Sequence, residues 1–455
     1  FLFVAILGLG CMGVAVSAKA YGHCEDPNDP QYDPNECEEV SETNTLEAAK
    51  KVTGTFDTSI FVRSPRSISD ITAILNKDDE NSVAMVEQWR RKADAQVPTT
   101  DDRNERIRYF RDRGLAASLL GRGQQAAKDV SYAVSLLTIT EKMDWQGQDL
   151  IRNLANIYRD LGNQREALKL TKEIIGLGDQ ECPMCMIAML APHAWFLAGI
   201  GDLEGANRAL EQGDQYAEWL EMQVTHEYFV RYFVVTTQTL AITHGRVSFL
   251  GGTYPQAEKQ FSEAIAILEK DIEENPFGSE LMPGGESISG LLHWMKYRAH
   301  GFLAETLARQ NRLNEAETHA RNAIRGQITH FGRYSVRTAR GVRILADILS
   351  EQGRFEDAAT LSKIIINIFE KMGHGPNSLT LSLAKRSLAD IYTGQARWQE
   401  ALDIYDEIER NFASDPGTLQ FLRSVNMNWA LPYIRSGKSE DIKNRLSALL
   451  ESQVK

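Results

Sequence analysis

The most reactive side chains in this sequence lie in the motif ECPMC, where two residues separate Cys182 from Cys185. A Cys-x-x-Cys pair at the start of a helix can lower the pKa of a thiol, which favours thiol–disulfide exchange. Redox enzymes place this motif after a strand, whereas the residues around it here have a helical pattern. The motif therefore favours a structural disulfide, with a thiol–disulfide enzyme acting through Cys182 and Cys185 as an alternative.

The histidines do not complete a metal site. A zinc site at the cysteine pair would need two more ligands. His193 lies eight residues after Cys185, and no fourth ligand is evident. His293 and His300 share a helical segment seven residues apart beside Trp294, which is typical of packing. We therefore predict that the protein holds no metal and no cofactor.

Other enzyme signatures are missing from the sequence. It contains no glycine-rich phosphate loop, nucleophile elbow or H-E-x-x-H motif, and GGES at 284–287 is typical of a turn. The 62 acidic and 50 basic residues give a formal net charge of −12, which argues against nucleic-acid binding through overall charge. A local basic patch is still compatible with this composition. We predict a protein that is not an enzyme and does not bind nucleic acid.

The elements that would position any site are helices. From about residue 66 onward, apolar residues recur at spacings of three and four, and breaks fall at Gly, Asn and Pro. The stretch 386–408 places Ala389 and Ala401 twelve residues apart, with Tyr392 between them and Tyr405 after them. Small residues at these spots allow two antiparallel helices to approach closely, while a Gly or small polar residue makes the turn. We expect the two tyrosines to pack between hairpins.

This pattern repeats along the chain. Counterparts of Ala401 are Ala126, Ala167, Ala206, Ala257, Ala316 and Ala358, followed by a degenerate copy at Ile442. The spacings are 41, 39, 51, 59, 42, 43 and 41 residues. The two larger gaps require insertions, near 225–240 and 273–290. Each hairpin leaves an apolar face open, so neighbours must stack into a superhelix.

These residues resemble the tetratricopeptide repeat, whose unit is about 34 residues. The resemblance implies an all-α, right-handed superhelical solenoid of about eight antiparallel hairpins over residues 66–455. The stretches beginning RSISDITAILN, HFGRYSVRTARG and GPNSLTLSLAKR are most similar to the long repeat region of bacterial CHAT-domain proteins. In those proteins a caspase-like protease domain follows the repeats, whereas here we expect that domain to be absent or encoded separately.

In the tetratricopeptide family, partners bind along the concave surface formed by the first helix of each hairpin. The positions that match this surface carry arginine repeatedly. We predict that the following residues form a partner-binding groove: Arg108, Arg111, Arg152, Asn156, Arg159, Arg340, Arg343, Asp347, Arg386, Asp390 and Trp195. Guanidinium groups bind carboxylates or phosphates through paired hydrogen bonds. An alternative is that these arginines pair with the acidic residues of the same face, such as Asp347 and Asp390. Ala191, Trp195 and Phe249 would form an apolar patch in the middle of the groove.

The N-terminal residues indicate export. Residues 1–20 form an apolar run in which Ala18 and Ala20 match the cleavage pattern of a secretory signal, which predicts Tyr21 as the first mature residue. An uncleaved membrane anchor is the alternative. Residues 21–65 would form a leader rich in Pro, Asp and Asn, tied by a disulfide between Cys24 and Cys37. We predict an exported protein in the periplasm or outside the cell.

These patterns lead to a functional hypothesis. We predict a non-catalytic scaffold or assembly factor of the bacterial envelope that binds a protein or peptide, such as an acidic or C-terminal segment, in the arginine-lined groove. A peripheral membrane or envelope complex is compatible with this hypothesis. The alternative implied by the CHAT resemblance is a sensor or regulatory subunit of a separately encoded protease. Neither the partner nor the oligomeric state is specified by the sequence.

Overall fold

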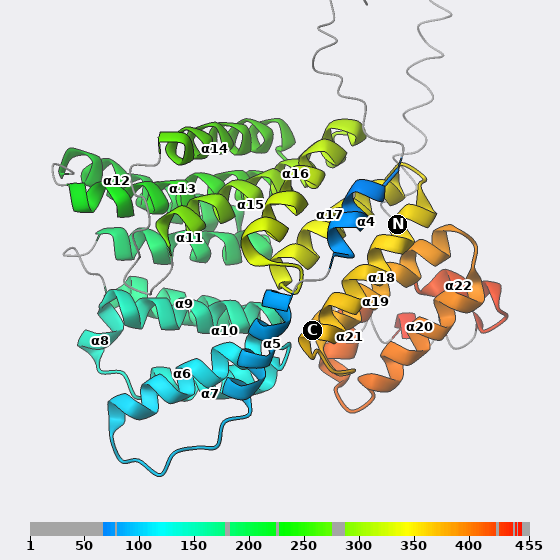
Figure 1. Ribbon diagram of the computed structural model, residues 1–455, viewed down its shortest axis with the longest axis horizontal. Coiled ribbons are helices and arrows are strands. Elements are labelled where there is room, and N and C mark those ends of the chain that lie inside the picture. Colours follow the sequence, from blue (N-terminus) through cyan, green and yellow to red (C-terminus); the bar gives the residue numbers. More distant parts are fainter. Residues whose placement is uncertain are drawn as a thin grey trace, which may run out of the picture. The chain divides into compact units, whose positions relative to one another are not determined.

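The computed structural model describes residues 67–77, 80–177, 183–223, 227–274, 287–424, 427–439, 442–443 and 445–447. The chain divides into two units, Phe1–Arg63 and Ser64–Lys455, and all described residues belong to the second (Figure 1). Within them the regular elements are helices, and none is long and apolar enough to cross a membrane. The predicted signal segment, the leader and Cys24, Cys37 and Cys182 lie outside the described residues, so export stays a prediction.

Seven antiparallel hairpins follow one another along the described chain (Figure 1). They are α6(Arg103–Leu119)–α7(Gly123–Ser135), α9(Trp145–Asp160)–α10(Gln164–Leu177), α11(Pro183–Gly199)–α12(Leu203–Gln223), α13(Glu227–Leu250)–α14(Tyr254–Glu274), α15(Ile288–Arg309)–α16(Leu313–Phe331), α17(Val336–Glu351)–α18(Phe355–Met372) and α19(Leu379–Gly394)–α20(Trp398–Asn411). Five shorter or flanking helices are α4(Ser69–Leu75), α5(Glu80–Ala93), α8(Ile139–Met143), α21(Pro416–Ser424) and α22(Ala430–Arg435). The predicted all-α solenoid of hairpins is confirmed, while the count of about eight repeats stays a prediction.

The ends of the first helix in each hairpin explain why the chain turns where it does. Five of these helices begin after a side chain that accepts a hydrogen bond from a first-turn N–H: Asp102, Asp144, Ser287, Ser335 and Ser378. Two residues after each first helix of the seven hairpins comes a residue with positive φ: Gly121, Gly162, Gly201, Gly252, Asn311, Gly353 and Ala396. The next N–H then donates back to a carbonyl five residues earlier, as from Arg354 to Leu349 at 2.8 Å. These bonds satisfy carbonyls that a helix end would leave unpaired.

Small residues meet where the two helices of a hairpin cross, as the repeat pattern predicts. The side chains of Ala389 and Ala401 are both fully buried. So are the corresponding pairs of earlier hairpins: Ala155 and Ala167, Ala194 and Ala206, Ala304 and Ala316, and Ala346 and Ala358. In the first hairpin an added Cβ at Gly114 would lie 2.6 Å from Val130 Cγ2. The helices therefore pack too closely for larger side chains at these positions.

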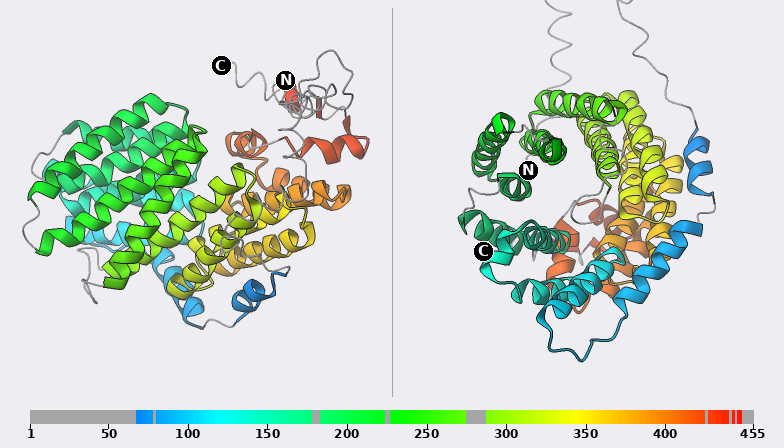
Figure 2. Two further views of the ribbon diagram at one scale, coloured as in Figure 1. Left: turned by 90° about the horizontal axis from the view of Figure 1, so that it is seen from above. Right: turned by 60° about the vertical axis from the view of Figure 1, so that its left-hand side comes forward.

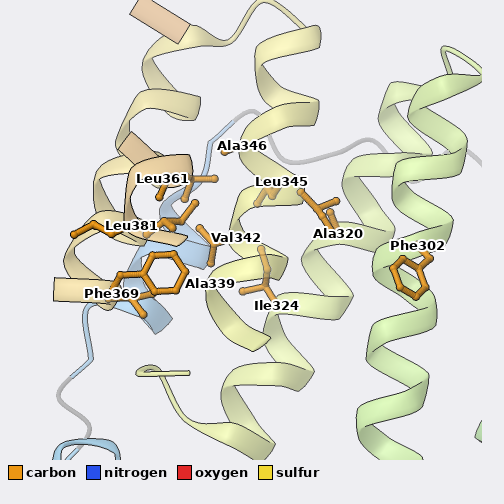
Figure 3. Packing of buried hydrophobic residues seen from close by; sticks show 14 of the residues in the cluster. Phe302, Ala320, Ile324, Ala339, Val342, Leu345, Ala346, Leu361, Phe369 and Leu381 are labelled. Atoms are coloured by element: carbon orange, nitrogen blue, oxygen red, sulfur yellow. The ribbon is translucent and has the colours of Figure 1, made fainter. Parts of the chain in front are cut away.

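Larger apolar side chains fill the space between neighbouring hairpins. Figure 3 shows Ile324 of α16, Val342 and Leu345 of α17, and Phe369 of α18 directed toward one another. All four are buried in one continuous hydrophobic cluster. Burial of such side chains contributes about 1.5–3 kcal/mol each relative to exposure. The stacking of hairpins therefore supplies the core that fixes the side chains of the inner face.

The short helix α4 packs against α16, far from it in sequence. Its residues Ile71 and Leu75 are fully buried. Asp70 forms ion pairs with Arg321 and Arg325. Arg321 also pairs with the buried carboxylate of Glu317 at 2.6 Å. Polar pairing and apolar contact together hold α4 on the fifth hairpin.

The first and sixth hairpins also contact each other. Arg90 of α5 donates a hydrogen bond to the Lys371 carbonyl at 3.0 Å. An added Cβ at Gly121 would lie 2.2 Å from His374 Nδ1, so the turn between α6 and α7 lies directly against the loop after α18. Figure 2 shows α5 between these two parts of the chain. Segments separated by more than 250 residues thus border one space.

Candidate partner-binding site

The inner face of the array is formed by the first helices of the hairpins, which contact one another along the chain. Arg298 precedes the buried Ala304 by six residues, as Arg340 precedes Ala346. Arg246 lies directly after Gly245, and its guanidinium reaches Glu305 of the next first helix. The regular spacing of side chains around each helix crossing therefore brings residues of successive hairpins to one surface.

Six arginines gather on this surface, and we call them the inner arginine cluster. They are Arg159 of α9, Arg246 of α13, Arg298 of α15, and Arg337, Arg340 and Arg343 of α17. Repulsion from other members of the cluster contributes to lowering the pKa of Arg246, Arg298 and Arg340. Such mutual repulsion requires that the charges of four hairpins lie close together.

Three of the predicted groove residues belong to this cluster: Arg159, Arg340 and Arg343. Arg343 pairs with Asp347 at 2.6 Å and with Glu305 at 3.2 Å. Arg159 pairs with the adjacent Asp160 at 2.8 Å. For Arg343 the alternative of pairing with acidic residues of the same face is therefore correct, whereas Arg340 has no such partner among the described residues.

Apart from Arg159, the predicted residues of the first two hairpins do not belong to this cluster. Arg108 of α6 is exposed, and Arg111 pairs with its neighbour Asp112 at 2.8 Å. Arg152 of α9 pairs with Asp149 one turn earlier, and Asn156 on the same helix is half-buried. None of these four predicted residues lines the cavity described below. Of the three predicted groove residues on α9, only Arg159 lines that cavity.

The predicted placement of Arg386 on an open groove wall is wrong. Its side chain is 4% exposed and lies inside the seventh hairpin. Asp390 accepts a hydrogen bond at 2.5 Å from the Tyr405 hydroxyl, so its carboxylate is used within the same hairpin. Burial, the charge of Asp390 and the hydrogen bond that Asp390 accepts raise the pKa of that hydroxyl far above its usual range. Arg386 is therefore part of the interior, and the half-buried Asp390 is engaged within the same hairpin.

Trp195 forms the centre of an aromatic platform rather than an open apolar patch. The guanidinium of Arg298 lies 4.8 Å from its ring centre, and that of Arg159 lies 5.1 Å from it. Arg246 lies over Phe249 at 4.7 Å. Ala191 is fully buried. The predicted apolar patch of Ala191, Trp195 and Phe249 is thus wrong, because arginines cover its rings and one member is not at the surface.

Arg246, Arg298 and Arg337 were not among the residues predicted to line the groove. A signal for two of them was available, because counting from the buried small residue places Arg298 and Arg246 on the same face as the predicted residues. Arg337 lies one turn before Arg340. Its guanidinium lies 4.8 Å from the Trp294 ring and 4.4 Å from the Phe331 ring. Nothing in the repeat pattern marks that position.

A cavity of about 1060 Å³ opens beside the cluster. Its charged lining consists of four arginines and two aspartates: Arg159, Arg298, Arg337, Arg340, Asp160 and Asp415. Its apolar lining comes from distant parts of the chain and includes Trp89, Leu119, Trp294, Phe331, Leu379 and Phe412. A net positive cavity thus lies within a chain whose formal net charge is −12.

Two cations of this cavity have no acidic partner. Arg298 and Arg340 form no ion pair or hydrogen bond within the part of the chain that the structure describes, and the buried Nε of Arg298 has no acceptor there. Removal from water, together with repulsion chiefly from Arg340, lowers the pKa of Arg298 well below its ordinary value. Removal from water and repulsion from Arg159 lower the pKa of Arg340 to about 10. Arginine side chains stay protonated in proteins at neutral pH, so both residues are cations.

The second cysteine of the ECPMC motif is buried and forms a disulfide. Cys185 is disulfide-bonded and its side chain is 1% exposed, and its partner lies outside the described residues. Its pairing with Cys182 stays a prediction. His193 bonds to the Thr171 hydroxyl at 2.7 Å. Among the described residues, no group of three or more metal-ligating side chains converges.

Hairpins with buried small residues at their crossings define an all-α solenoid of antiparallel helix pairs. The chain is similar to BtubC from P. vanneervenii, with 15% identity over 54% of this chain and 91% of that chain (TM-score 0.41). It is similar to a Pyrococcus horikoshii signal transduction ATPase with a tetratricopeptide repeat sensor, with 12% identity over 96% and 73% (TM-score 0.42). A third similar structure is a Rap protein complexed with competence and sporulation factor, with 14% identity over 80% and 97% (TM-score 0.40). No protein-family model and no curated protein matches the sequence.

Proposed function

We propose that this chain is a non-catalytic protein–protein interaction scaffold that binds an acidic segment of a partner protein at the inner arginine cluster. The observation that carries the proposal is the pair Arg298 and Arg340, two guanidinium groups that line one cavity and have no acidic partner among the described residues. Cations that lie beside other cations without an acidic partner are unfavourable, more so for the half-buried Arg298, unless a ligand compensates them. An acidic segment would supply that compensation.

The lining of the cavity supports a peptide rather than a small inorganic ion alone. Trp294, Phe331, Leu379 and Phe412 offer apolar contacts beside the cations. A protein segment combines acidic groups with apolar side chains and a backbone, so it can use both kinds of surface. The volume of about 1060 Å³ exceeds what a single carboxylate requires. Binding would then combine charge pairing with burial of apolar side chains.

We also propose that the scaffold acts in an exported complex of the bacterial envelope. The support is the apolar run of residues 1–20 with Ala18 and Ala20 before Tyr21. Intact mass spectrometry of the protein isolated from its host tests this, because a chain that starts at Tyr21 is expected and a chain that retains residues 1–20 would contradict cleavage. A regulatory subunit of a separate CHAT protease rests on sequence resemblance alone. The burial of Cys185 argues against a thiol–disulfide enzyme.

Affinity capture from the native host tests partner binding. The full chain carrying Arg298→Glu and Arg340→Glu is compared with the wild type and with Arg208→Glu. Arg208 is an exposed arginine of α12 that pairs with Glu204, so its reversal controls for a change of charge. We expect the double variant to lose the partner that the wild type and the control both recover. Equal recovery by all three would refute binding at the cluster, provided that circular dichroism shows the same helix content.

A further inference from the structure

The charges of the cavity do not balance, and the imbalance indicates the charge of the ligand. Asp160 pairs with Arg159 at 2.8 Å. The carboxylate of Glu305 lies 3.1 Å from Arg246 and 3.2 Å from Arg343. Arg298 and Arg340 remain without an acid within the described part of the chain. The lining itself contains four arginines and two aspartates, without lysine or glutamate. The cavity lining therefore carries an excess of two positive charges.

Arg298 and Arg340, the two uncompensated charges, line the same cavity. Of the charged groups that lower the pKa of Arg298, Arg340 has the largest effect. A ligand that neutralises both must therefore place two negative charges within a small volume. A single carboxylate would leave one guanidinium uncompensated. Two carboxylates on separate side chains would repel each other when held this close.

The surroundings of Arg298 restrict how it can contact a ligand. Its guanidinium lies 4.8 Å from the Trp195 ring centre, 5.1 Å from that of Trp294 and 5.2 Å from that of Phe302. Aromatic rings stabilise the cation through its flat face. Its N–H groups point outward in the plane of the guanidinium. They can therefore donate hydrogen bonds to the oxygens of a tetrahedral oxyanion. Trp195 and Trp294 thus act as positioning residues.

We infer that Arg298 and Arg340 together bind a phosphoryl monoester on the partner segment, namely a phosphorylated side chain. This inference rests on the proposed function, because it names the acidic group that the scaffold recognises. A phosphoryl monoester carries close to two negative charges at neutral pH on three adjacent oxygens. It therefore matches both the number and the closeness of the uncompensated cations. The apolar lining would contact the residues that flank the modified side chain.

Calorimetric titration of the full chain tests the ligand chemistry directly. The probes are N-acetyl-phosphoserine amide, N-acetyl-aspartyl-aspartate amide and inorganic phosphate, each at the same ionic strength and pH 7.5. We expect the phosphoserine probe to bind most tightly. We expect Arg298→Gln or Arg340→Gln to weaken it about 10- to 100-fold, since each charge-assisted hydrogen bond contributes about 1.5–3 kcal/mol. The Arg208→Gln variant is expected to bind as the wild type does.

Three results would overturn the inference. Equal binding of the di-aspartate probe would identify a pair of carboxylates as the ligand. Equal binding of inorganic phosphate would identify the free ion rather than a modified side chain. Phosphoserine binding that is unchanged in both variants would place the anion elsewhere.

Treating the host extract with phosphatase before capture separates the two proposals. Loss of capture after treatment supports the phosphorylated side chain. Capture that survives treatment but still requires Arg298 and Arg340 refutes that ligand and leaves the scaffold proposal standing.

Discussion

Replacing Arg340 by glutamine is expected to stabilise the protein in the absence of a ligand. Arg340 forms no ion pair within the described part of the chain. Removal from water and repulsion from Arg159 and Arg343 lower its pKa to about 10 from 12.5. Such a shift means that the folded state disfavours the charge. Because the side chain is exposed, solvent screening reduces the effect, and we expect the free energy of unfolding to rise by about 1 kcal/mol.

Urea unfolding followed by circular dichroism measures this change. Arg208→Gln is the control, because it removes an arginine from an exposed pair and is expected to change the free energy of unfolding by less than about 0.5 kcal/mol. A loss of 1 kcal/mol or more in Arg340→Gln would refute the reasoning, since it would show that Arg340 makes stabilising contacts in the free protein. Most substitutions destabilise, so a gain at this site would be diagnostic.

A double-mutant cycle isolates the repulsion between the two unpaired arginines. In the wild type, removing Arg340 relieves its repulsion with Arg298. In the background of Arg298→Gln that repulsion is already gone, so the gain from Arg340→Gln is expected to shrink by about 0.5 kcal/mol or more. An unchanged gain would show that the two guanidinium groups do not interact. The cycle cancels the loss of ring contacts in Arg298→Gln, because both arms of the comparison share it.

Three further perturbations test the fold that positions the site. Glu317→Gln is expected to lower the free energy of unfolding by about 1–3 kcal/mol in urea, because it removes a fully buried carboxylate that pairs with Arg321 and Arg354, while each arginine keeps a second acidic partner. Glu204→Gln at an exposed pair should change it by less than about 0.5 kcal/mol. Ala396→Gly is expected to stabilise the protein by about 1 kcal/mol, and Gly353→Ala is expected to destabilise it by about 1–2 kcal/mol. Both positions have positive φ, which only glycine adopts without strain. A lower thermal unfolding temperature for Ala396→Gly than for Gly353→Ala would refute this reasoning. Burial raises the pKa of Asp347 from 3.8 to about 6 despite its pair with an arginine, so between these pH values the folded state binds a proton that the unfolded state does not. The contribution of Asp347 to the free energy of unfolding therefore falls as pH rises through this window. Asp347→Asn should remove that fall in urea midpoints measured from pH 4 to 7.

The repeat pattern predicted the hairpins because it reports contacts that are local in sequence. Ala389 and Ala401 are both fully buried, and the first helix of each hairpin ends where the small or polar turn residue occurs. The same counting would also have placed Arg298 on the inner face. This part of the site follows from helical periodicity, which depends only on neighbours in sequence.

Contacts between distant hairpins could not be read from the pattern. Whether an arginine faces a cavity or the interior depends on the next helix, and Arg386 is 4% exposed although it has the same repeat position as Arg343. Likewise, the ion pairs of Asp70 with α16 connect residues that no local rule relates. The grouping of Arg159 with Arg340 depends on how successive hairpins stack, and periodicity carries no information on that.

Hydrogen–deuterium exchange with the captured partner bound is the most direct test of where this protein recognises it. With the partner present, we expect slower amide exchange in α9, α15 and α17, which carry Arg159, Arg298 and Arg340, and unchanged exchange in α12 and α14. We expect this protection to disappear in the Arg298→Glu, Arg340→Glu variant. Protection confined to α12 and α14, with none in the three helices of the cluster, would contradict binding at the inner arginine cluster.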